Sequence, residues 1–156
     1  MQTILPIAIG ADDAALDFKN QIIRHLTEQG HTVIDYSSDI LPDNSMYPDV
    51  AYSVAKAIKA GQHVRGILIC GTGIGMSIVA NKVLGIRAAQ CHDTFSAERA
   101  RKSNDAQIMT MGARVIGVEL AKLIVEAWLT SEFEGGGSTP KVDKIKLYEQ
   151  DMCKDQ

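Results

Sequence analysis

The chain has little of what nucleic-acid or membrane proteins depend on. Its 156 residues include 16 Lys and Arg against 19 Asp and Glu, a net charge of −3, and aromatic residues make up only 5%. The lack of a basic stripe argues against nucleic acid as the main partner. No apolar run approaches the roughly 20 residues that a membrane-spanning helix needs. The sequence therefore predicts neither nucleic acid nor membrane as a partner.

Cysteine is also scarce. Cys70, Cys91 and Cys153 are odd in number and their spacing matches no metal site, so neither a disulfide framework nor a bound metal is expected. The first residues lack the charged start and apolar core of a secretory signal. These features together favour a reducing cytoplasm as the location.

Short apolar runs alternate with amphipathic stretches along residues 1–133. The runs predict strands at 3–9, 32–36, 65–70, 86–91 and 106–111. The stretches predict helices at 14–28, 49–60, 76–83, 94–103 and 118–131, and a polar loop occupies 37–48. The first helix should bury Leu16, Ile22, Ile23 and Leu26. Repeated β-α units predict an α/β domain with a five-stranded parallel sheet and helices on both faces.

The remaining residues, 134–156, differ in composition. A glycine-rich, flexible link at 134–140 precedes a charged helix expected at 141–150. This helix has too little apolar surface to fold alone. It should therefore pack on a neighbouring surface, and a second subunit is a reasonable candidate.

Residues 66–77 form the most informative segment. An apolar strand ends in Cys70, a glycine-rich turn follows, and a helix comes next. Exposed N–H groups and the positive helix end favour an anion at the turn, and the same field favours the thiolate form of a cysteine. A buried core thiol is the alternative for Cys70. The segment matches a dinucleotide-binding motif only in part, because Met76 stands where the motif has its third glycine, although Asp93 lies near the distance expected for the ribose-binding acid. A nucleotide P-loop is excluded because no Gly-Lys-Ser/Thr follows.

In an open parallel sheet, ligands bind beyond the carboxyl ends of the strands. The expected strands lead to the pairs Asp12-Asp13, Cys70-Gly71 and His92-Asp93 and to Arg114. Each of these residues also has a structural interpretation. Asp13 would cap the next helix, and Arg114 would pair with Glu119 rather than bind an anion. His92 would be a loop histidine with its hydrogen bonds satisfied, which is the simpler interpretation.

Several motifs resemble those of type B ribose-5-phosphate isomerases and of the subunits of galactose-6-phosphate isomerase. They span residues 69–75 (ICGTGIG), 80–82 (ANK), 85–88 (GIRA), 104–105 (ND), 111–117 (MGARVIG), 121–122 (AK) and 133–136 (FEGG). The resemblance implies a Rossmann-like fold, a homodimer or tetramer, and aldose–ketose isomerisation of a sugar phosphate without metal or cofactor.

The resemblance also implies roles for individual residues. Cys70 would be the base, Asp12 would bind a hydroxyl or help to open a ring, and Tyr47 would line the pocket. The enediolate oxygens would be held by Thr72 and by the N–H groups of the loop formed by Gly71, Gly73, Ile74 and Gly75. The partner subunit would supply Asn104 and the phosphate ligand Arg114.

The sequence departs from the family at its phosphate-binding and ring-opening positions. Asp13 and Ser103 each stand where a histidine is usual, and Gly137 and Lys141 replace two arginines. Residues 91–117 look most like a subgroup that acts on four-carbon sugar phosphates in erythritol catabolism. A tetrose 4-phosphate cannot close a furanose ring, so it needs no ring-opening histidine. D-Erythrulose 4-phosphate and D-erythrose 4-phosphate are therefore the first-choice substrates.

Three alternatives stay open at this point. The substrate would instead be ribose 5-phosphate or galactose 6-phosphate, the chain would be an inactive sugar-phosphate-binding homologue, or it would be a nicotinamide-dependent oxidoreductase. The retained Cys70 and Thr72 argue against mere binding, and Met76 argues against the oxidoreductase.

Overall fold

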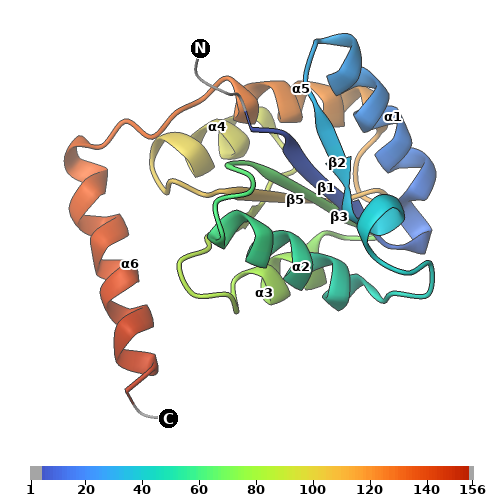
Figure 1. Ribbon diagram of the computed structural model, residues 1–156. Coiled ribbons are helices and arrows are strands. Elements are labelled where there is room, and N and C mark those ends of the chain that lie inside the picture. Colours follow the sequence, from blue (N-terminus) through green and yellow to red (C-terminus); the bar gives the residue numbers. More distant parts are fainter. Residues whose placement is uncertain (1–4, 155–156) are drawn as a thin grey trace.

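Five parallel strands form one sheet in the computed structural model, which describes residues 5–154 (Figure 1). The order across the sheet is β2-β1-β3-β5-β4. The strands are β1 (Ile7–Ala11), β2 (Val33–Asp35), β3 (Gly66–Cys70), β4 (Ala88–Gln90) and β5 (Ile108–Gly112). The predicted five-stranded parallel sheet is confirmed. Thr3 and Ile4, at the start of the predicted first strand, lie outside the described residues.

Helices cover both faces of this sheet (Figure 1). They are α1 (Leu16–Glu28), α2 (Tyr47–Lys59), α3 (Ile74–Ala80), α4 (Thr94–Lys102), α5 (Val118–Leu129) and α6 (Thr139–Met152). Successive strand residues point to opposite faces, so two cores form. Ile9, Ile67 and Met109 join the core under α1, α4 and α5, whereas Ala8, Leu68 and Ile108 join the core under α2 and α3.

The structure corrects three local predictions. Leu16 is 43% exposed rather than buried, because a 3₁₀ turn at Asp13–Ala15 precedes α1 and Ala15 takes the inner position instead. The predicted polar loop begins with a π-helical turn at Tyr36–Ile40. Helix α3 begins two residues before the predicted start, directly after Gly73, whose φ of 78° turns the chain into the helix.

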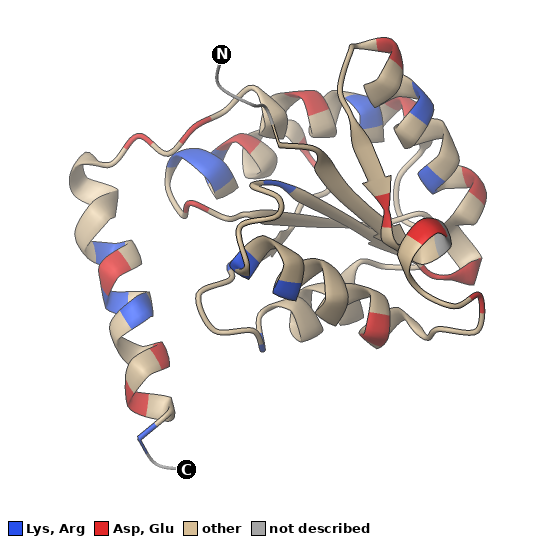
Figure 2. Ribbon diagram, viewed as in Figure 1, with Lys and Arg blue, Asp and Glu red and all other residues tan. Residues whose placement is uncertain are grey.

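Helix α6 extends away from the body of the molecule (Figure 1). Figure 2 marks residues of both charges along it. Its described apolar side chains include Ile145, Leu147 and Tyr148, all exposed, while Val142 is buried at its start. One contact to the body joins the Gly85 N–H to the Glu149 carboxylate over 3.2 Å. Among residues 5–154, no helix is long and apolar enough to cross a membrane.

The strand order places a topological switch point between the carboxyl ends of β1 and β3, where a ligand crevice is expected. The chain leaves β1 toward β2 on one side, whereas β3, β5 and β4 extend the sheet on the other. Connections at such a switch point diverge to opposite faces, which opens room for a ligand. Asp12 and Cys70 end these two neighbouring strands, and the Asp12 N–H donates to the Ile69 carbonyl over 3.2 Å.

Candidate active site

Cys70 is the last residue of β3 and only 6% exposed. Its sulfur accepts a hydrogen bond of 3.0 Å from the Gly73 N–H. The turn that follows the strand brings this N–H back over the sulfur. A backbone N–H donor is therefore aimed at the sulfur of a buried cysteine at the end of the strand.

The loop after Cys70 is held at two consecutive peptide groups. The Gln90 side chain donates to the Thr72 carbonyl over 2.6 Å. The Thr110 hydroxyl, which is fully buried, donates to the Gly73 carbonyl over 2.8 Å. An added Cβ on Gly73 would lie 2.8–2.9 Å from the backbone of Met111, so the loop backbone packs directly on β5. These contacts fix the N–H that faces the Cys70 sulfur.

Thr72 is exposed at the tip of this loop. Its hydroxyl oxygen accepts a hydrogen bond of 3.3 Å from the Ile74 N–H. The hydroxyl proton therefore remains available for an oxygen of a bound molecule. This is the arrangement expected of a group that stabilises a developing oxyanion.

Asp12 follows β1 at the same crevice. Its carboxylate accepts from the Ala14 N–H over 3.1 Å, so Asp12 caps the 3₁₀ turn and not Asp13, the alternative that the sequence suggested. Burial raises the pKa of Asp12, and the charge of Asp13 adds to the rise; the Ala14 hydrogen bond and Arg114 oppose it. Asp13 itself is exposed beside a small cavity of about 140 Å³ that Ser37 and Ser45 also line.

Arg114 lies over the glycine loop of its own chain. Its N–H donates to the Gly71 carbonyl over 3.0 Å, and its side chain lies 3.5–3.7 Å from where a Gly71 Cβ would be. The prediction that Arg114 enters from a partner subunit is therefore wrong, because the turn after β5 folds back over β3. Glu119 does not take Arg114 as a partner; it pairs with Lys122 at 2.8 Å.

Tyr47, at the start of α2, forms the opposite wall of the loop. Its side chain lies 2.6–2.7 Å from where a Gly75 Cβ would be, so a larger residue at position 75 would displace the ring. The ring is 38% exposed. The structure thus brings together, within one chain, Cys70, Thr72, Asp12, Arg114, Tyr47 and the loop Gly71, Gly73, Ile74 and Gly75.

Residues 7–145 match the family model described as Ribose/Galactose Isomerase. The chain belongs to this isomerase family. It is 68% identical over 146 residues to a D-erythrulose-4-phosphate isomerase of Pectobacterium atrosepticum, covering 94% of this chain and 96% of that one. It is 51% identical over 146 residues to a ribose-5-P isomerase B of Listeria innocua, covering 94% and 98%.

A solved structure of the same family has the same fold. The ribose-5-phosphate isomerase B of Clostridium thermocellum superposes with a TM-score of 0.89 at 44% identity, over 95% of this chain and 99% of that one. The family and the Rossmann-like fold predicted from the motifs are thereby confirmed.

Three other predicted site residues of this family member lie away from the Cys70 crevice. Ser103 and Asn104 follow α4, which runs back to the amino ends of the strands, and Lys141 lies on α6. The Ser103 hydroxyl accepts from the Arg99 guanidinium at 2.5 and 3.1 Å. Asn104 is exposed. Within one chain, the structure does not bring these three residues to Cys70.

His92 has a structural contact. Its Nε2 atom accepts a hydrogen bond of 2.9 Å from the Gly112 N–H, so the ring holds the turn after β5. The simpler interpretation of His92 as a satisfied loop residue is confirmed.

Sequence reasoning missed Thr110 and Gln90. Both lie in strands, where alternation predicts which face a side chain takes but not which loop carbonyl it meets. A hydroxyl residue in the otherwise apolar run 108–111 was the one available signal. Within the described part of the chain, no cluster of three or more His, Cys, Asp or Glu side chains is arranged to hold a metal ion.

Proposed function

We propose that this chain is an aldose–ketose isomerase that interconverts D-erythrulose 4-phosphate and D-erythrose 4-phosphate through an enediolate. The observation that carries the proposal is the Cys70 sulfur, hydrogen-bonded by Gly73 and flanked by Thr72, Asp12 and Arg114 at one crevice. The 68% identical Pectobacterium relative, named for D-erythrulose 4-phosphate, supports the choice of substrate.

The Cys70 thiolate removes a proton from C1 of the ketose. The electron pair of that C–H bond forms the C1=C2 double bond, and negative charge develops on the carbonyl oxygen O2. The Thr72 hydroxyl and the N–H groups of the glycine loop stabilise this oxyanion. The Cys70 thiol then returns the proton to C2 while O1 loses its own proton, which completes the aldehyde.

Asp12 moves the proton between O1 and O2 in this scheme. A carboxyl with a raised pKa is a better acid near neutral pH than an ordinary aspartate. Arg114 binds the substrate phosphate, since a guanidinium matches phosphate geometry with two parallel hydrogen bonds. Asp13 stands where the family usually has a histidine. Its negative charge disfavours phosphate near β1, so phosphate binding depends on Arg114.

The active form proposed is a homodimer, with two dimers forming a tetramer as a further option, working in the cytoplasm. Residues 134–154 pack on the partner and bring Lys141 and the partner's Asn104 to the Cys70 crevice. The exposed apolar side chains of α6 and the distance of Asn104 from the crevice of its own chain support this arrangement. Mixing Cys70→Ala chains with Asn104→Ala chains should regenerate activity; none after verified subunit exchange counts against a shared site.

A four-carbon substrate explains the absence of an imidazole at position 103. Position 103 holds a hydroxyl, a far weaker acid than an imidazolium, and the Nε2 atom of His92 is already occupied by the Gly112 N–H. Ribose 5-phosphate is the second candidate, favoured by the Listeria and Clostridium relatives named for that substrate. Its furanose would have to open before proton abstraction at C2.

Deuterium incorporation tests the isomerase directly. D-Erythrulose 4-phosphate incubated with the enzyme in D₂O should acquire deuterium at C1 and form D-erythrose 4-phosphate labelled at C2, as read by NMR. The Cys70→Ala variant should give neither signal. Binding of the sugar phosphate without any exchange by the wild type would instead identify an inactive binding protein.

A further inference from the structure

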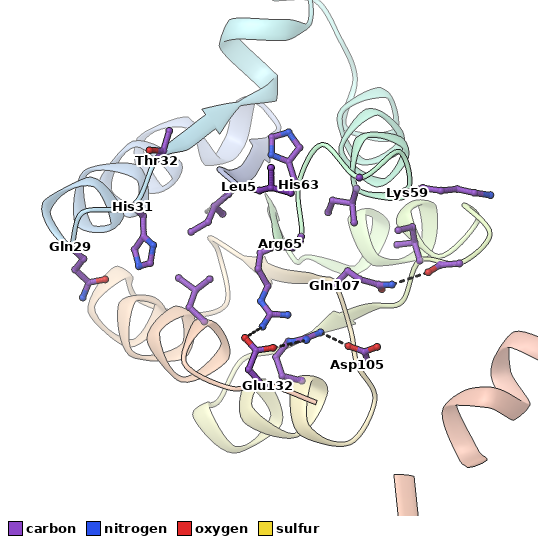
Figure 3. Close-up of a pocket in the computed structure, with 18 of the residues that line it drawn as sticks. Leu5, Gln29, His31, Thr32, Lys59, His63, Arg65, Asp105, Gln107 and Glu132 are labelled. Carbon is purple, nitrogen blue, oxygen red and sulfur yellow. Dashed lines mark hydrogen bonds and ion pairs between the residues drawn. The ribbon is translucent and has the colours of Figure 1, made fainter. Parts of the chain in front are cut away.

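A cavity much larger than the one beside Asp13 lies near the amino ends of the strands, whereas Cys70 lies at the carboxyl end of β3. Figure 3 shows the residues that line it. Its volume is about 1070 Å³, at the upper end of the range for sites that hold small molecules. Two arginines and a glutamate supply the charged part of its lining, and three aliphatic side chains supply an apolar part: Arg65, Arg101, Glu132, Leu84, Ile86 and Leu129. The proposed isomerase chemistry uses none of them.

Two buried guanidinium groups meet one carboxylate at this cavity. Arg65 is 8% exposed and Arg101 is 4% exposed. Glu132 lies 2.7 Å from the Arg65 Nη2 atom and 3.5 Å from the Arg101 Nη2 atom. Figure 3 shows Arg65 and Glu132 pointing toward each other inside the pocket.

Positive charge is in excess around this pair. Asp105 is the other nearby carboxylate, and it is shared between Arg101 at 3.1 Å and Arg87 at 3.2 Å. Burial and the charge of Arg101 lower the pKa of Arg65. Among the described residues, the buried Nε of Arg101 has no hydrogen-bond partner. Buried charges and donors are costly unless they are paired, so the cluster favours an additional anion.

Glu132 is a weak internal counterion. Its side chain is 78% exposed, and ion pairs with an exposed partner contribute little stability. A phosphate group carries more charge and more acceptor oxygens than a carboxylate, and it pairs with guanidinium groups through two parallel hydrogen bonds. An anionic ligand of this kind would therefore displace the Glu132 side chain into solvent.

We propose that this cavity binds a phosphorylated small molecule of about the size of a nucleoside monophosphate. Its phosphate lies on Arg65 and Arg101 in the place of the Glu132 carboxylate. Leu84, Ile86 and Leu129 line the same cavity and provide apolar contacts for the rest of the molecule. None of these residues lines the Cys70 crevice of the same chain, so ligand binding here is measured separately from isomerase activity.

Calorimetric titration with adenosine 5′-monophosphate and with inorganic phosphate tests this proposal. We expect adenosine 5′-monophosphate to bind with one site per chain and more tightly than phosphate alone. Glu132→Gln removes the competing carboxylate and should tighten binding by about tenfold, the factor that 1.4 kcal/mol gives. Glu119→Gln, an equal charge change at another exposed glutamate, should leave affinity unchanged.

Two further variants separate this cavity from the catalytic crevice. Arg114→Ala should still bind the nucleotide, because Arg114 is not part of the cavity. Arg101→Lys, checked for folding by circular dichroism, should weaken binding because it loses the guanidinium fork. No binding by the wild type, loss of binding in Arg114→Ala, or equal affinities for Glu132→Gln and Glu119→Gln would overturn the proposal. Isomerase assays on the same samples test the proposed function independently.

Discussion

The Gly73 N–H group donates a 3.0 Å hydrogen bond to the Cys70 sulfur. The carbonyl of the same peptide group, that of Thr72, accepts a 2.6 Å hydrogen bond from Gln90. One peptide group therefore links the Gln90 side chain on one side to the Cys70 sulfur on the other. Hydrogen bonds in such a chain polarise one another, so Gln90 strengthens the contact between the Gly73 N–H and the Cys70 sulfur.

Replacement of Cys70 separates the base from the other cysteines. Cys70→Ala should lower kcat by about 10²-fold or more, as expected for lost acid–base catalysis, and Cys70→Ser should be similarly poor. Burial, with a smaller contribution from Asp93, raises the pKa of Cys91 to about 12, so this thiol stays protonated near neutral pH. Cys91→Ala is the matched control and should keep its kcat. A Cys70→Ala variant with more than a tenth of wild-type kcat would reject the assignment.

The two loop contacts should differ in their effect on stability. Gln90→Leu and Thr110→Val should both lower kcat more than they change KM, since each loosens the loop that faces Cys70. Only Thr110→Val should also lower the free energy of unfolding, by about 1–3 kcal/mol, because it leaves the Gly73 carbonyl without its buried donor. Thr110→Ser should restore both quantities in large part. Unchanged kcat in both variants would show that the loop needs neither contact.

Gly73 and Gly75 serve different purposes, which alanine substitutions will distinguish. Gly73→Ala places a Cβ against the Met111 backbone at a φ of 78°, and the left-handed backbone alone costs about 1–2 kcal/mol. It should therefore unfold at a clearly lower temperature. Gly75→Ala meets the Tyr47 ring, which is partly exposed and able to move aside. Its melting temperature should change little while KM rises. Equal melting temperatures for the two variants would contradict this account.

Asp12→Asn should uncouple stability from activity. The pKa of Asp12 is raised in the folded protein, so the native state binds its proton more readily than the unfolded chain does. Above this raised pKa, the charged carboxylate of Asp12 lowers the free energy of unfolding. As the pH falls below the raised pKa, Asp12 becomes protonated in the folded protein and the destabilisation disappears. The amide of the variant keeps an oxygen for the Ala14 N–H. We expect a melting temperature above wild type at pH 7, a difference that shrinks toward pH 4, and a lower kcat. A lower melting temperature at pH 7 would contradict the sign.

Much of the fold followed from patterns that sequence displays directly. Five apolar runs separated by amphipathic stretches predicted the parallel sheet, and strand ends predicted that Asp12, Cys70 and Arg114 would share one edge. The element boundaries moved by a few residues because turns such as Asp13–Ala15 and Tyr36–Ile40 take their shape from side-chain caps.

The errors concern contacts between segments that are far apart in the sequence. Arg114 was assigned to the partner, yet its turn folds over Gly71 of the same chain. Gln90 and Thr110 support the loop through hydrogen bonds across strands that no spacing rule encodes. Local patterns predict which residues reach an edge of the sheet, whereas the packing of turns decides what each side chain meets there.

The specificity constants for two substrates test the central claim most directly. The wild-type enzyme should have a higher kcat/KM for D-erythrulose 4-phosphate than for ribose 5-phosphate, measured side by side in coupled assays. Ser103 cannot open a furanose ring, and the four-carbon substrate has none to open. Ser103→His should raise the turnover of ribose 5-phosphate selectively. A wild-type kcat/KM that is higher for ribose 5-phosphate would contradict the four-carbon assignment.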